Sequence, residues 1–248
     1  MMRRFLCAVC LVGLGFGMVQ AQDKAEDVNL FQTFFQDATI TKTPFGEGLF
    51  QFSDYDNASS IDLAVQAGLP ITPQFQLSGG LGFRNISIDV PAGVNIDNSS
   101  SGITDMLISG RYNVVQGPTP ITIGGLITLP IGSEDIGESS FDFSGFGSLR
   151  HALQGGVVLT STVALEFIET GPNRDTSLLL AGGVIYPTQN NLNLIGELNI
   201  RTEGDYILLS GGVDYLLSSG GRLRGGLGLG LDDGAPNFQL RAGYLLGF

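Results

Sequence analysis

Charged side chains recur on alternate residues of extended apolar segments in this sequence, and they are the groups best suited to bind or steer a solute. Six are acidic and seven are basic: Asp62, Arg84, Asp105, Arg111, Asp142, Arg150, Glu166, Glu197, Arg201, Asp214, Arg222, Arg224 and Arg241. A nearly balanced set of this kind either lines a narrow polar path or pairs internally and braces a filled interior. The sequence leaves both functions open.

Catalytic chemistry finds little support in the sequence. His151 is the only histidine and lies beside Arg150 in a predicted turn, where a solvated role is expected. Hydrolases use histidine together with a serine, aspartate or similar partner. The glycine-rich run GGLGLG at 225–230 lacks the lysine and the strand-to-helix context of a phosphate-binding loop. The sequence therefore predicts no enzyme, no catalytic residue and no cofactor.

Two acidic clusters carry the oxygen ligands that Ca²⁺ prefers: Asp232 with Asp233, and Glu134 with Asp135 and Glu138. The simpler interpretation, which we favour, is a solvated acidic rim. Both cysteines, Cys7 and Cys10, lie in the N-terminal apolar run, so no thiolate ligand is expected elsewhere. We therefore predict no metal site.

The N-terminus predicts Sec-dependent export. Arg3 and Arg4 precede an apolar run over 5–19, and small residues at Val19 and Ala21 are typical of a signal-peptidase site. We expect a signal peptide over 1–21, a leader over 22–46 and a barrel over 47–248. Without Arg3 and Arg4, ten basic residues remain against 24 acidic ones, which disfavours a nucleic-acid partner.

The leader contains an apolar stretch, DVNLFQTFFQD, over 27–37. Leu30, Phe31, Phe34 and Phe35 have helical spacing more than strand spacing. The segment is expected to be a short helix at the periplasmic mouth, a plug in the lumen, or an ordered leader to the first strand.

Period-two alternation predicts an all-β fold: a transmembrane antiparallel up-and-down β-barrel of about 12 strands, with a range of 10–14. The expected strands are 47–53, 60–69, 74–88, 102–114, 119–130, 139–151, 155–168, 175–187, 191–202, 205–217, 221–231 and 236–247. A charge on the lipid face near the bilayer midplane costs about 2–4 kcal/mol, so the charged faces should line the lumen. A soluble secreted barrel is the alternative that alternation alone leaves open.

The last strand carries an assembly signal. Apolar residues alternate from Phe238 and end on Tyr244, Leu246 and Phe248, a pattern that resembles the C-terminal signature of outer-membrane barrels. That resemblance implies recognition by the barrel-assembly machinery, insertion into outer-membrane lipid and a location in the cell outer membrane. We expect a monomer.

The predicted connections alternate between two kinds. Short turns occur at 70–73, 115–120, 151–154, 187–191 and 218–221, and longer or more acidic loops at 53–59, 89–101, 130–139, 168–175, 202–205 and 231–236. In outer-membrane barrels the short turns are periplasmic and the long loops extracellular. The sequence therefore predicts an acidic extracellular rim.

From about Gly102 onward, the chain resembles the outer-membrane barrel family named for the meta-cleavage pathway of phenol degradation. Four segments carry the resemblance: GITDMLISGRYNVV, ITIGGLITLPIGSED, LNLIGELNIR and GLGLGLDDGAPNFQLRAGY. The resemblance implies a passive outer-membrane channel or transporter for small, apolar or aromatic solutes, and it supplies no catalytic residues. The alternatives are a structural or adhesive barrel with a closed lumen and, last, a surface enzyme.

Overall fold

The computed structural model describes residues 28–31, 37–89, 98–137, 141–170, 173–188 and 190–248. Within these ranges every regular element is a strand: β1 (Phe45–Tyr55), β2 (Ala58–Thr72), β3 (Phe75–Ile88), β4 (Ser99–Ile103), β5 (Met106–Val115), β6 (Ile121–Leu129), β7 (Phe143–Ala152), β8 (Val158–Thr170), β9 (Asn173–Pro187), β10 (Leu192–Arg201), β11 (Tyr206–Leu216), β12 (Arg222–Gly230) and β13 (Phe238–Gly247). In the described parts of the chain, no helix is long and apolar enough to cross a bilayer.

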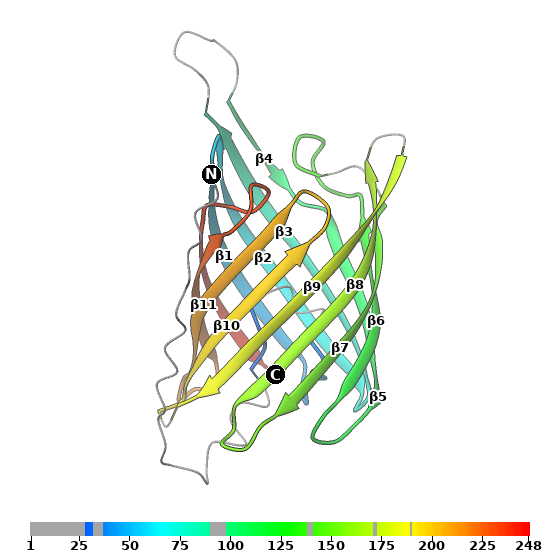
Figure 1. Cartoon of the computed structure of the whole chain (residues 1–248), viewed down its shortest axis with the longest axis vertical. Helices are drawn as coiled ribbons and strands as arrows, with labels where there is room; N and C mark the ends of the chain where they lie inside the picture. Colours follow the sequence, from blue (N-terminus) through cyan, green and yellow to red (C-terminus); the bar gives the residue numbers. More distant parts are fainter. Residues whose placement is uncertain (1–27, 32–36, 90–97, 138–140, 171–172, 189) are drawn as a thin grey trace, which may run out of the picture.

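The strands form one closed antiparallel barrel of 12 positions, as the alternation predicts (Figure 1). Closure is made by β1, which pairs with β2 on one side and with β13 on the other. The 13 strands fill 12 positions around the barrel because β4 and β5 share one of them: both pair with β3. The strand expected over 102–114 is therefore interrupted at Thr104 and Asp105. Thr104 bridges the interruption, since its Oγ1 accepts a 2.9 Å hydrogen bond from the Gly82 amide.

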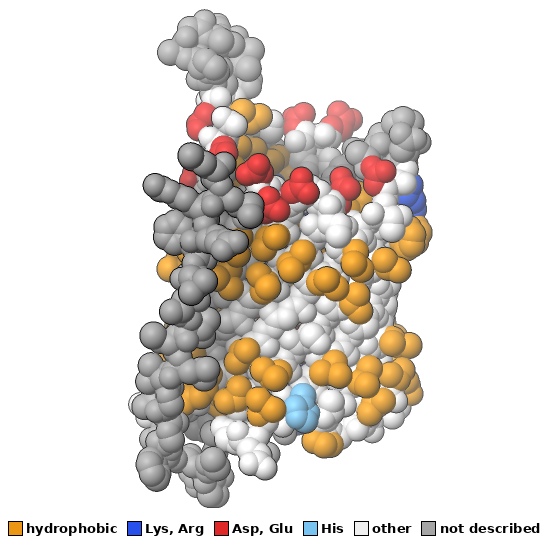
Figure 2. All heavy atoms as spheres, viewed as in Figure 1, with side chains coloured by type: hydrophobic (Ala, Val, Ile, Leu, Met, Phe, Trp, Pro, Cys, Tyr) orange, Lys and Arg blue, Asp and Glu red, His pale blue; other side chains and the backbone are white. Residues whose placement is uncertain are grey.

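The pleat sends successive side chains to opposite faces of the wall. Arg111 is 2% exposed, whereas its neighbour Tyr112 is 44% exposed. Outward positions such as Leu63 and Val65 on β2 are apolar and exposed. Figure 2 shows apolar side chains in two bands around the visible face, one near each rim. An apolar outer surface of this kind suits lipid and not water.

The two rims differ in charge. Acidic side chains gather at one end of the barrel in Figure 2, and this is the end of the longer connections. At the other end the chain reverses in short turns, three of which have glycines in the left-handed region: Gly117 (φ 105°), Gly155 (φ 91°) and Gly220 (φ 89°).

This asymmetry makes a topological prediction. A protease site inserted in the 89–101 connection should be cut on intact cells, because the acidic rim is expected to face outward. A site inserted at 187–191 should resist cleavage until the outer membrane is permeabilised. Immunoblotting with an antiserum against the barrel, which follows loss of the full-length band, measures both. Cleavage of the second site alone would invert the orientation.

The N-terminal elements differ from the expected boundaries. β1 begins at Phe45, two residues before the expected start, and the described residues 28–31 and 37–44 are not helical. Residues 32–36, at the centre of the helix considered above, lie outside the described residues. The expected signal peptide over 1–21 also lies outside them.

Candidate functional site

The interior of the barrel is the candidate site, because inward positions of most strands carry polar or charged side chains. Eleven of the 13 residues singled out by sequence lie on strands: Asp62, Arg84, Arg111, Arg150, Glu166, Glu197, Arg201, Asp214, Arg222, Arg224 and Arg241. Asp105 and Asp142 instead flank β5 and β7 at the loop end. There Asp105 Oδ1 accepts from the Gly132 amide at 2.8 Å, and Asp142 Oδ1 accepts from the Glu169 amide at 2.7 Å.

The most buried charges form a network across β1, β11 and β12. Arg224 Nη1 donates to Glu47 Oε1 at 3.0 Å, and Arg224 Nε lies 3.3 Å from Asp214 Oδ2. Arg222 Nη1 also donates to Asp214. The side chains of Arg224, Asp214 and Glu47 are 3%, 1% and 0% exposed. Charges this far from water are stabilised only by such partners, so this network braces the wall.

Two ion pairs lie nearer the acidic rim and retain access to solvent. Arg84 on β3 pairs with Asp62 on β2. Arg201 Nε on β10 lies 2.8 Å from Glu166 Oε2 on β8. Their arginine side chains are 42% and 41% exposed. The interior is therefore more accessible to water toward the acidic rim than at the buried network.

Residues 28–31 lie inside the barrel and are held by side chains from four strands. Their backbone carbonyls accept hydrogen bonds from arginines: Val28 from Arg150 at 2.9 Å, Asn29 and Leu30 from Arg224 at 2.6 and 2.9 Å, and Phe31 from Arg241 at 2.5 Å. The Phe31 amide donates to Glu197 Oε2 at 3.0 Å.

Residues 37–41 continue this contact along β3, β5, β6 and β7. Arg150 Nη1 lies 3.0 Å from Asp37 Oδ2, and Arg111 Nη1 donates to the Asp37 carbonyl at 3.0 Å. Thr122 Oγ1 donates to the Ala38 carbonyl at 3.0 Å, and Gln76 Oε1 accepts from the Thr41 amide at 2.9 Å. Of the three roles considered for the leader, these contacts favour the plug.

The inner wall carries apolar side chains between β7 and β10. One cluster joins Phe146, Ala164, Leu179 and Ala181, all buried. A second joins Val28, Leu30 and Phe31 of the N-terminal segment to Val158, Ile185 and Ile195 of the wall. The inward face of these strands therefore carries apolar as well as polar side chains. Ile195, for example, points inward between Asn193 and Glu197.

Sequence reasoning missed three groups of interior residues. Glu47 was missed because the inward charges were assigned only from the strand at 60–69 onward, although Glu47, Gln51 and Ser53 already alternate with Gly48, Phe50 and Phe52. The uncharged partners Gln76 and Thr122 give no charge signal. The inward apolar residues give no signal either. Where two successive residues are both apolar, the sequence does not show which of them points into the barrel.

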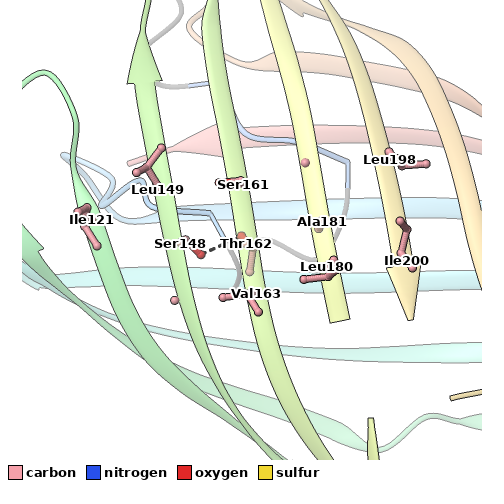
Figure 3. A pocket seen from close by; sticks show the side chains of 12 residues that line it. Ile121, Ser148, Leu149, Ser161, Thr162, Val163, Leu180, Ala181, Leu198 and Ile200 are labelled. Atoms are coloured by element: carbon pink, nitrogen blue, oxygen red, sulfur yellow. Dashed lines mark hydrogen bonds between the residues drawn. The ribbon is translucent and has the colours of Figure 1, made fainter. Parts of the chain in front are cut away.

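A depression of about 550 Å³ lies on the outer face across β6–β10 (Figure 3). Its outward residues include Leu149, Val163 and Leu180, and it is hollow where Gly147 and Gly182 carry no side chain. Behind it, on the inner side, Ser148 and Thr162 hydrogen-bond at 2.9 Å (Figure 3). The depression faces the lipid side and is separate from the lumen.

A protein-family model described as "Putative MetA-pathway of phenol degradation" matches residues 19–248. The chain belongs to this phenol-degradation family. A search of curated proteins found no significant match.

Solved structures similar to this family member are outer-membrane barrels. An outer-membrane channel from Pseudomonas putida F1 has 14% identity and a TM-score of 0.72, covering 89% of this chain and 100% of that chain. The KdgM porin has 12% identity and a TM-score of 0.57, covering 82% and 99%. The NanC porin has 10% identity and a TM-score of 0.55, covering 83% and 100%. At these identities the likeness shows the fold, an outer-membrane β-barrel.

In this member of the phenol-degradation family, His151 lies near the short-turn end of β7, where its Nδ1 is 2.7 Å from Thr119 Oγ1. The described residues contain no group of three or more His, Cys, Asp or Glu side chains placed to hold a metal ion.

The C-terminal aromatics point outward, with Tyr244 42% and Phe248 72% exposed.

Proposed function

We propose that this protein is a passive channel of the outer membrane that carries small apolar or aromatic solutes. The observation that carries the proposal is the apolar cluster of Phe146, Ala164, Leu179 and Ala181 on the inner wall. Apolar side chains at inward positions offer an apolar solute a favourable surface that ions and sugars do not need, since burial of apolar surface favours apolar partners. The family's name, which refers to phenol degradation, supports the same class of solute.

The path combines this apolar wall with the two solvent-accessible ion pairs. Arg84 with Asp62 and Arg201 with Glu166 lie toward the acidic rim, where a solute is expected to enter. Leu179 lies beside Arg201 in register, so polar and apolar groups meet at one level of the wall. We propose that a weakly polar aromatic molecule passes here because its ring can contact the apolar wall while its polar group contacts the ion pairs. Insertion through the C-terminal strand and monomeric assembly belong to the same proposal.

Uptake into vesicles tests this function. In vesicles whose outer leaflet is lipopolysaccharide, which slows unaided entry of apolar molecules, the protein should accelerate uptake of 1-naphthol but not of arabinose. Leu179→Asn should lower the naphthol rate a few-fold, because it replaces part of the apolar wall with an amide. Leu179→Met keeps the wall apolar at similar volume and should retain the rate.

The second candidate is a structural or adhesive barrel with a closed lumen. It is favoured by the buried network around Arg224 and by the segment held inside the barrel. The vesicle preparation described above also distinguishes a channel from a closed barrel. A protein that inserts and shows heat-modifiable migration, yet gives neither naphthol uptake nor ion conductance in a planar bilayer, is structural.

A further inference from the structure

The Phe31 side chain fills a recess in the inner wall made by two paired glycines. Gly212 on β11 and Gly226 on β12 are register partners. A Cβ placed on Gly212 would lie 2.4 Å from Phe31 Cε2, and one on Gly226 would lie 3.1 Å from the same atom. The ring therefore lies directly on backbone, in space that any side chain at Gly212 would take. We call Gly212, Gly226 and Arg224 the aromatic recess.

A fixed cation covers the ring. Arg224 Cζ lies 5.2 Å from the Phe31 ring centroid, within the range of a cation–π interaction. The guanidinium is held in this position by Glu47 on β1 and by Asp214 on the adjacent strand β11. The attraction depends on the electron density of the ring, so the recess favours an electron-rich aromatic ring over an aliphatic group of equal size.

Two polar side chains of the wall hold the backbone of Phe31. The Phe31 backbone engages a donor and an acceptor of the wall: Arg241 Nη1 donates to its carbonyl at 2.5 Å, and Glu197 Oε2 accepts from its amide at 3.0 Å. A phenolic hydroxyl both donates and accepts, so it can form a hydrogen bond with either side chain once the Phe31 backbone has left it.

We propose that the aromatic recess is a binding site for a small phenol-type ring, and that Phe31 occupies it until such a solute competes. The inference deepens the proposed function, on which it rests for the route by which the solute reaches the lumen. The recess then gives the channel selectivity for electron-rich rings, and displacement of Phe31 couples solute binding to release of residues 28–31 from the wall.

Glycine-selective NMR tests binding without any transport measurement. A ring lying on Gly212 and Gly226 shifts their amide proton resonances through its ring current. In refolded, ¹⁵N-glycine-labelled protein, Phe31→Ala should remove this shift. Adding p-cresol should restore it saturably, and 4-methylcyclohexanol, the saturated analogue, should not. In the unaltered protein, half-saturation should require more p-cresol, because Phe31 competes.

Phe31→Leu is the matched variant, because it keeps the recess filled with an apolar group but removes the ring. It should also lack the ring-current shift and bind p-cresol, and it replaces Phe31→Ala if that variant fails to fold. The inference is overturned if p-cresol shifts neither glycine, if the saturated analogue shifts both equally, or if Phe31 removal leaves p-cresol affinity unchanged. Binding without naphthol uptake would refute the proposed function and leave the recess standing.

Discussion

Arg224→Met is expected to lower the free energy of unfolding by about 3–5 kcal/mol, because it removes the shared partner of two buried carboxylates. Glu47 and Asp214 have side chains that are 0% and 1% exposed, so water cannot replace the lost guanidinium. The variant also loses the hydrogen bonds to the Asn29 and Leu30 carbonyls. Urea titration in detergent micelles, followed by intrinsic tyrosine fluorescence, measures the loss.

Arg84→Met is the control in the same barrel. Arg84 also pairs with an aspartate across adjacent strands, but its side chain is 42% exposed, and a pair of this kind contributes about 0–1 kcal/mol. Adding Glu47→Gln to Arg224→Met should recover much of the loss, because Glu47 is then neutral whereas Asp214 keeps its second partner, Arg222. Equal effects of Arg224→Met and Arg84→Met would show that the network is not buried in solution.

The strand pattern and the orientation of most side chains follow directly from the sequence. The period of two survives in every barrel strand because a charge turned toward lipid would cost several kcal/mol. For this reason Arg111 and Tyr112 face opposite sides of the wall, as do Arg224 and Leu223. The number of strand positions around the barrel is predicted too. Each position corresponds to one segment with an apolar outward face, and a turn or loop separates it from the next.

The partners inside the lumen do not follow from the pattern. Arg111 donates to the Asp37 carbonyl, and Arg150 contacts both Asp37 and the Val28 carbonyl. A backbone carbonyl is present at every residue, so composition gives no signal of which one an arginine will bind. The inward positions of Phe146 and Ile185 are equally hidden, because an apolar side chain is tolerated on either face once another apolar group covers it inside.

Removal of residues 28–39 is expected to raise single-channel conductance several-fold in planar bilayers. The described parts of this stretch contact the wall at Arg111, Arg150, Arg224 and Arg241, so they occupy the lumen where those side chains converge. Ion selectivity should move toward anions at the same time. The stretch contains one charge, Asp37, and its loss leaves arginines exposed to the pore.

Asp37→Asn separates the two effects. Its carboxylate lies 3.0 Å from Arg150 Nη1, and its side chain is 5% exposed, so neutralising it removes the charge but leaves residues 28–31 held by Arg224 and Arg241. Reversal potential under a salt gradient should therefore shift toward anions in this variant with little gain in conductance. If the shortened protein conducts no better than the unaltered one, the lumen is closed elsewhere, at the wall itself or at the connection over 130–137, which packs against β4 through Ser133.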